Sequence, residues 1–94
     1  MSVSDDDSDA ALVARSLAGD QRAFAILVGR YKRYLYAIIV RLVSDPDEAL
    51  DLVQEAFVSA HAALRRYDPD RPLRGWLARI ALNKARDWRR KERV

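Results

Sequence analysis

The chain has 94 residues, of which 50% are apolar, and it contains no cysteine. This length fits one small domain, and the lack of cysteine excludes disulfides, thiolate zinc ligands and thiol catalysis. The net charge is +3, yet residues 65–94 carry eleven Lys or Arg against four Asp or Glu, whereas residues 1–64 carry six against ten. A chain that is polarised in this way favours two partners of opposite charge.

Residues 1–8 are rich in aspartate, and we expect them to form a flexible acidic tail before a folded domain at residues 9–94. A signal peptide would be basic and then apolar at this position. The longest apolar stretches are too short, and too often interrupted by Arg and Lys, to span a bilayer. The sequence therefore predicts a cytoplasmic protein without membrane insertion.

Two helices are predicted in the first half of the domain. The first covers about residues 9–18, and Gly19 suits the left-handed position that closes it. The apolar residues on its one side are Leu12, Val13 and Leu17. Asp20 can cap a second helix that continues to about residue 43. Its apolar residues recur at the spacing of a core-facing stripe, and they are Phe24, Leu27, Val28, Tyr31, Leu35, Ile38, Ile39 and Leu42.

A third helix is predicted to begin within the sequence Ser-Asp-Pro-Asp-Glu at residues 44–48. Asp45 is expected at the N-cap, Pro46 in the first helical position and Glu48 two residues later, which is a capping-box arrangement. Acidic side chains in a first turn also interact favourably with the helix dipole. The expected buried seam of this helix consists of Leu50, Val53, Phe57, Ala60 and Leu64.

A loop at Tyr67–Pro72 separates the third helix from a fourth, because it holds two prolines with aspartates beside them. The fourth helix is expected from about Leu73 to at least Arg90. The residues near its apolar side are Leu73, Trp76, Leu77, Ile80, Ala81, Lys84 and Trp88. Because no segment alternates apolar and polar residues as a β-strand does, the predicted fold class is all-α, a compact four-helix domain.

The fourth helix also carries a basic stripe opposite its apolar side. Its members recur at intervals of 4, 3, 4 and 3, and they are Arg79, Asn83, Arg86, Arg90 and Arg93. Arg71 and Arg74 extend the charge onto the preceding loop, and Tyr67 lies at the mouth of that loop. Such a stripe indicates binding to a nucleic-acid backbone. The alternative is that these residues are only a solvated basic helix end, which the helix dipole favours. That alternative does not explain why the stripe begins a full turn into the helix or why it includes Asn83.

The third helix has an acidic face of the opposite kind. Asp51 and Glu55 are an i,i+4 pair of like charge, which costs a few tenths of a kcal/mol in an isolated helix. The segment from residue 44 to residue 64 contains no Lys or Arg to offset them. Two interpretations stay open at this point: a solvated face that maintains solubility, or a docking face for a basic partner.

Catalysis is not indicated anywhere in the chain. His61 is the only histidine, and Ser59 points to another side of the same helix, so no nucleophile and base are paired. The acids at residues 45–51 begin a helix and lack the glycine and the bidentate glutamate of a calcium loop. The sequence therefore predicts a protein that is not an enzyme and that has no cofactor and no metal site.

Three stretches together resemble region two of sigma factors, and most closely the extracytoplasmic-function class. The first is Asp51-Leu-Val-Gln-Glu-Ala-Phe57, and the second is Tyr67-Asp-Pro. The third is Leu73-Arg-Gly-Trp-Leu-Ala-Arg-Ile-Ala-Leu-Asn-Lys-Ala-Arg-Asp87. The residues at 14–24 are also typical of that class. The likeness covers roughly residues 10–92, and the joint pattern is far more specific than any one piece.

The resemblance implies an alternative sigma factor domain for transcription initiation, which docks on the clamp helices of the largest subunit of RNA polymerase. The matching positions for that contact are Asp51, Gln54 and Glu55. It also implies that the fourth helix and its preceding loop bind the non-template strand of the promoter −10 element. A base would be flipped into a pocket at residues 68–72, beside Asn83. The expected DNA-binding residues are Tyr67, Asp68, Asp70, Arg71, Arg74, Arg79, Asn83, Arg86 and Arg90.

Members of this class commonly have an anti-sigma partner, so the resemblance implies one here. They also continue into a second helical domain that reads the −35 element, and we expect that domain to be absent from this chain.

Two alternative functions remain. A helix-turn-helix repressor would need a short turn, which the loop with two prolines fits poorly. A helical protein-interaction module would use the same surfaces without contacting DNA.

Overall fold

The computed structural model describes residues 8–92 and builds them from four α-helices and one short 3-10 turn. The elements are α1 (Asp9–Leu17), α2 (Gln21–Val43), α3 (Pro46–Ala63), η2 (Leu64–Arg66) and α4 (Leu73–Glu92). No strand occurs between residues 8 and 92. The predicted all-α class is confirmed, and the helices begin and end within about a residue of their expected bounds. Among the described helices, none is both long and apolar enough to cross a membrane.

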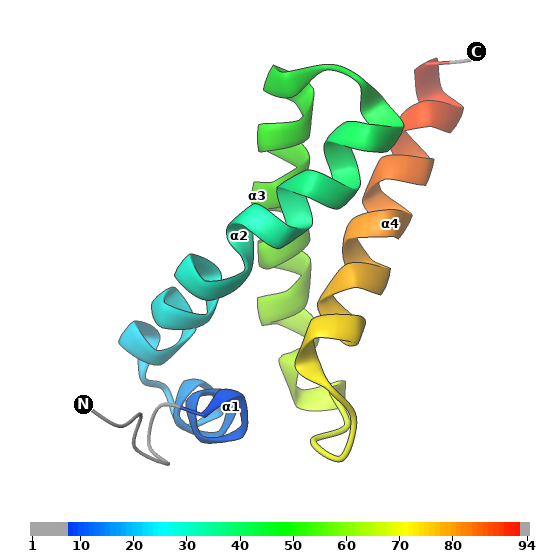
Figure 1. The fold of residues 1–94 in the computed structure, drawn as a ribbon. Coiled ribbons are helices and arrows are strands. Elements are labelled where there is room, and N and C mark those ends of the chain that lie inside the picture. Colours follow the sequence, from blue (N-terminus) through cyan, green and yellow to red (C-terminus); the bar gives the residue numbers. More distant parts are fainter. Residues whose placement is uncertain (1–7, 93–94) are drawn as a thin grey trace.

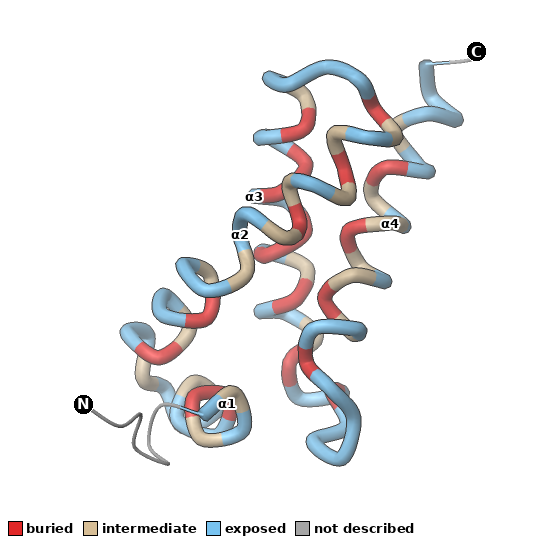
Figure 2. Tube along the Cα trace, in the orientation of Figure 1, coloured by how far each residue is buried: buried red, intermediate tan, exposed pale blue. Residues whose placement is uncertain are grey.

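The central element is α2, which contacts α1, α3 and α4. Figure 1 shows α3 and α4 running side by side in opposite directions, with α2 crossing them at an angle. The short helix α1 lies against the N-terminal half of α2, at the lower left of the view. In Figure 2 the buried segments of α2, α3 and α4 face the space that the three helices enclose. The core is thus shared by three helices, and α1 closes one end of it.

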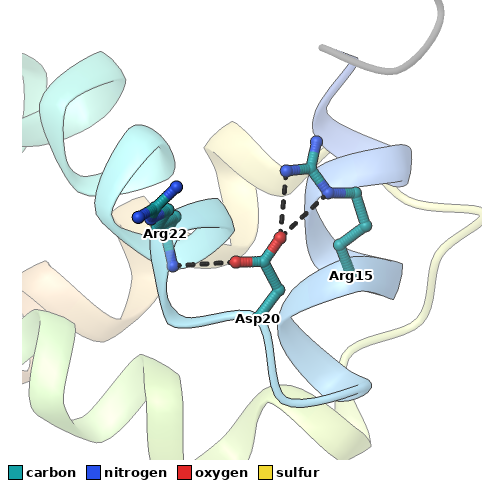
Figure 3. Close-up of polar contacts among 3 residues, drawn as sticks. All are labelled: Arg15, Asp20 and Arg22. Carbon is teal, nitrogen blue, oxygen red and sulfur yellow. Dashed lines mark hydrogen bonds and ion pairs between the residues drawn. The ribbon is translucent and has the colours of Figure 1, made fainter.

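The turn between α1 and α2 is fixed by its backbone and by Asp20 (Figure 3). Gly19 adopts φ 102°, and the amides of Gly19 and Asp20 donate to the carbonyls of Ser16 and Arg15 at 3.0 and 2.9 Å, which is a Schellman ending. The Asp20 carboxylate then accepts from the Arg22 amide at 3.0 Å and pairs with the Arg15 guanidinium at 3.0 Å. The hydrogen bond from Arg15 lowers the pKa of Asp20. The predicted cap and closure are both confirmed.

Half of the predicted capping box forms at the start of α3. The Asp45 side chain accepts from the amides of Asp47 and Glu48 at 3.0 and 3.2 Å. Glu48 does not return the bond to Asp45; its carboxylate accepts instead from the indole nitrogen of Trp88 at 3.1 Å. The first turn of α3 is therefore tied to the last turns of α4. Ser44 makes the sharp entry possible with φ 62°.

Two leucines expected on buried faces are exposed. Leu17 is 45% exposed and Leu50 is 56% exposed. α3 packs against both α2 and α4. Its buried face therefore includes the small residue Ala49, next to Leu50 in the sequence, and small side chains allow the helices to approach each other closely. The residues that α3 buries are Ala49, Leu52, Val53, Ala56, Phe57 and Ala60. The rest of the expected seam is confirmed, and Leu64 lies buried in η2.

The start of α1 is tied to α2 through one carboxylate. Asp9 pairs with Arg30 at 2.7 Å and also accepts a hydrogen bond from the Tyr31 hydroxyl. Partial burial, followed by the bond and the charge of Asp9, raises the pKa of Tyr31 to about 12. Ser8 caps the helix by accepting from the Ala11 amide at 3.1 Å. The expected acidic tail before it lies outside the described residues, apart from Ser8.

Candidate nucleic-acid and protein interfaces

The loop between η2 and α4 is held by its own side chains. The Asp68 carboxylate accepts from the Asp70 amide at 2.9 Å, and the Asp68 carbonyl accepts from the Arg71 amide at 3.0 Å. This is the local bonding that makes aspartate a turn residue. An ion pair between Asp68 and Arg71 at 3.7 Å adds little, because both side chains are largely exposed. The turn leaves the Asp70 and Arg71 side chains facing solvent.

Tyr67 anchors this loop. Its hydroxyl donates to the Arg71 carbonyl, and its ring packs on Trp76 with centroids 5.1 Å apart and planes tilted by 47°. Burial, followed by the negative charges of Asp9 and Asp68, raises the pKa of Tyr67. The side chain is only 9% exposed. Tyr67 therefore exposes little surface with which it would meet a base, and the prediction that it does so stays a prediction.

A hollow of about 210 Å³ opens where the loop joins α4. It is lined by Arg71, Pro72, Gly75, Trp76 and Arg79. Two of the predicted DNA-binding residues, Arg71 and Arg79, are brought together here, while Asn83 lies one turn beyond the lining. A methyl group added at Gly75 would meet no atom within 4 Å. The space above this glycine is therefore open.

The predicted basic stripe is exposed along α4. Its described members Arg79, Asn83, Arg86 and Arg90 are all exposed. The buried residues of the same helix lie on the opposite side, and they are Leu73, Leu77, Ala81 and Ala85. Arg93, the last residue of the stripe, lies outside the described residues. The stripe and the hollow are continuous, because Arg79 belongs to both.

The side chain of Arg74 points toward α2, which the sequence did not indicate. Its guanidinium lies over the ring of Tyr34 in α2, 4.2 Å from the ring centroid. A cation in this position interacts favourably with the ring, and the guanidinium keeps its N–H groups available for other acceptors. Arg74 is exposed, so it adds positive charge between α4 and α2 and not to the stripe.

The acidic face of α3 is exposed as predicted. Asp51, Gln54 and Glu55 line an open hollow of about 480 Å³ together with Val58, Ser59 and Lys84. The cation Lys84 comes from α4, so a basic residue does face these acids although α3 itself supplies none. Sequence reasoning missed Val58, which is 70% exposed. Its position seven residues after Asp51 places it on the same face and could have indicated it.

The histidine considered for catalysis packs against an aromatic ring. His61 is exposed, and its ring lies edge-on to Phe24 with centroids 4.8 Å apart. Within residues 8–92 no three His, Asp or Glu side chains gather in a way that could hold a metal ion. The chain is thus an all-α domain with a basic face and hollow on α4 and an acidic, partly apolar face on α3.

Comparison with known proteins identifies the family. The Sigma-70 region 2 family matches residues 27–94, and the chain belongs to it. It is 47% identical over 90 residues to the RNA polymerase sigma factor CnrH of Cupriavidus metallidurans, which covers 95% of this chain and 47% of CnrH. It is 41% identical over 81 residues to the ECF RNA polymerase sigma-E factor of Escherichia coli K12, covering 86% of this chain and 42% of that factor. The expected likeness to region two of the extracytoplasmic-function class is confirmed.

Two solved structures are similar in fold. One is an NMR structure of an engineered region 2 of sigmaE in complex with GTAAAA, with a TM-score of 0.83 and 41% identity over 92% of this chain and 90% of that chain. The other is CnrH in complex with the cytosolic domain of CnrY, with a TM-score of 0.77 and 44% identity over 84% of this chain and 51% of that chain. The chain spans about half the length of the curated relatives it matches.

Proposed function

We propose that the chain is the region-two domain of an alternative sigma factor, which docks on RNA polymerase core and captures the melted −10 strand of a promoter. One observation carries the proposal: the hollow at the start of α4 leads directly into the exposed stripe of Arg79, Asn83 and Arg86. The GTAAAA ligand of the sigmaE region 2 structure supports a single strand as the occupant.

In this proposal the arginines hold the strand and the hollow receives a base. Arg79, Arg86 and Arg90 neutralise phosphates of any sequence, whereas the Asn83 amide can both donate to and accept from one base edge. The flipped base enters the hollow beside Trp76. Unstacking costs a few kcal/mol, and stacking on an aromatic ring returns about 1–3 kcal/mol. The strand is captured without breaking a bond, so the role is not enzymatic and needs no cofactor.

The acidic face of α3 is the proposed docking surface for polymerase. Asp51 and Glu55 supply charge for a basic partner, and Val58, about one turn after Glu55, supplies an exposed apolar contact. An apolar centre with a charged rim is the usual anatomy of a protein interface. The partner we propose is the pair of clamp helices in the largest polymerase subunit, which implies that the domain acts in the cytoplasm.

An anti-sigma protein is the second protein partner we propose. The relative CnrH forms a complex with the cytosolic domain of CnrY, and a comparable partner would inhibit this domain by covering the α3 face and the α4 stripe. Inhibition would then follow from simple exclusion. A structure of the inhibited complex that leaves both surfaces open would contradict this mechanism.

The rival function is a helical protein-interaction module that does not contact DNA. Binding to single-stranded hexamers distinguishes this module from a sigma factor domain. The hexamer GTAAAA, and its variants with each base at each position, are titrated at several salt concentrations. The parent is expected to bind with a clear base preference. Arg86→Ala should weaken all hexamers alike and reduce the salt slope by about 0.7 unit, because one phosphate contact is lost. Asn83→Ala should reduce discrimination at one position by about 1–3 kcal/mol.

Arg89→Ala is the matched control, since Arg89 is an exposed cation on α4 outside the stripe. It should change the salt slope much less than Arg86→Ala. A base profile that is flat in the parent, or salt-independent binding, would favour the protein-interaction module. If the profile is unchanged in Asn83→Ala, Asn83 does not read a base.

A further inference from the structure

Helix α2 has a charge excess that neither proposed surface uses. It contains five Arg or Lys and no Asp or Glu between Gln21 and Val43. Like charges along a helix repel each other by a few tenths of a kcal/mol per close pair. Arg30 is offset by Asp9, whereas no acidic side chain within residues 8–92 pairs with Arg33 or Arg41. The fold itself gives no reason for this excess.

Part of the charge gathers on one exposed face of the helix. Arg30, Arg33 and Arg41 follow one another at intervals of three and eight residues, which places them on one side of a helix, and all are exposed. Tyr34 borders this side. We call these four residues the α2 basic face. From residue 30 to residue 41, no large apolar side chain is exposed on α2.

Arg74 connects the α2 basic face to the hollow on α4. It lies in the first turn of α4, three residues after Arg71 of the hollow, and its guanidinium reaches the ring of Tyr34 at 4.2 Å. The contact holds Arg74 in place between the two helices. Positive charge therefore continues from the hollow across Arg74 to the α2 basic face, of which Tyr34 is a member.

We propose that the α2 basic face binds the same DNA strand where it leaves the −10 hexamer. This inference rests on the proposed function, because the strand must first occupy the hollow. A polyanion fits the face better than a protein partner does, since the face offers cations and no large exposed apolar group. Continuity through Arg74 favours one strand running over both helices, and positively charged grooves track single strands in this way.

The test compares strands that differ only in length. Labelled GTAAAA is titrated beside the same hexamer carrying six thymidines at its 5′ end or at its 3′ end. The parent should bind one of the two extended strands several-fold more tightly than the hexamer. Arg33→Gln combined with Arg41→Gln should remove most of that gain. Its salt slope on the extended strand should be shallower by about 1.4 units, at about 0.7 unit for each lost phosphate contact on a single strand.

Lys32→Gln combined with Arg89→Gln is the control, because it removes the same charge from exposed positions outside the α2 basic face and outside the α4 stripe. It should keep the gain from extension, and circular dichroism should show unchanged helicity in both double variants. The inference is overturned if neither extension improves binding by the parent, or if the control loses as much as the test variant. Failure of the parent to bind the hexamer at all would count against the proposed function, and this extension would fall with it.

Discussion

At the scale of one residue, a substitution at Gly75 is the most direct test of the hollow, because Gly75 is one of its lining residues. It lies inside α4, where glycine is less favourable than alanine by up to about 1 kcal/mol, and an added methyl group would meet no atom within 4 Å. Gly75→Ala should therefore stabilise the fold by about 0.5–1 kcal/mol in thermal or urea unfolding. The same methyl group narrows the hollow, so binding of GTAAAA should weaken although the protein is more stable.

Gly29→Ala is a matched control for that substitution, since Gly29 is an exposed helical glycine in α2 with equally open surroundings. It should raise stability by a similar amount and leave binding of the hexamer as it is. If Gly75→Ala binds the strand as tightly as the parent, the hollow does not receive a base.

The exposure of several candidate site residues could be predicted from the sequence, whereas the surroundings of others could not, for one physical reason. Helical spacing places Arg79, Asn83 and Arg86 on one exposed side, because that depends only on the period of the helix. The surroundings of Tyr67 and Arg74 depend on which helix comes across from another part of the chain. Spacing gives no information on that, so the burial of Tyr67 and the contact between Arg74 and Tyr34 emerge only from the fold.

At the scale of the elements, the bond between Glu48 and Trp88 joins α3 to the end of α4 that bears Arg86 and Arg90. Glu48→Ala should lower the free energy of unfolding by about 0.5–1.5 kcal/mol, the net value of such a bond. The change should also loosen the last turns of α4, which hydrogen exchange of their amides would detect. Glu48→Gln keeps an acceptor oxygen and should retain most of the stability. Equal losses in both variants would mean that the Glu48 charge matters and not the bond.

Helix bounds were predictable because their signals are local: Asp20, Gly19 and the Asp45–Pro46 pair act within one turn. The capping box was only half right, because Trp88 lies 40 residues away and competes for the Glu48 carboxylate. The buried face of α3 was displaced for a similar reason. A helix packed between two others buries a wider surface than one stripe, and three of the six residues that α3 buries are alanines.

At the scale of the whole molecule, positive and negative charge are divided between two surfaces, for which we propose different partners. The α4 stripe lies opposite the core side of its helix, whereas Lys84 on another side of α4 faces the acidic residues of α3. DNA and a basic protein surface could therefore be bound at the same time without contact between them. Such an arrangement suits a domain that brings polymerase to a promoter, and the division was already visible in the sequence.

The most direct test of this account is sedimentation of the chain with a clamp-helix fragment of polymerase and labelled GTAAAA together. We expect one complex that contains all three components in equal amounts. Asp51→Lys combined with Glu55→Lys should lose the fragment and keep the strand, because two contacts with a basic partner become repulsive. Asp87→Lys combined with Glu92→Lys, an equal change of charge on exposed residues of α4, should keep both. The account is contradicted if strand and fragment displace each other, or if the α3 variant binds the fragment as well as the parent does.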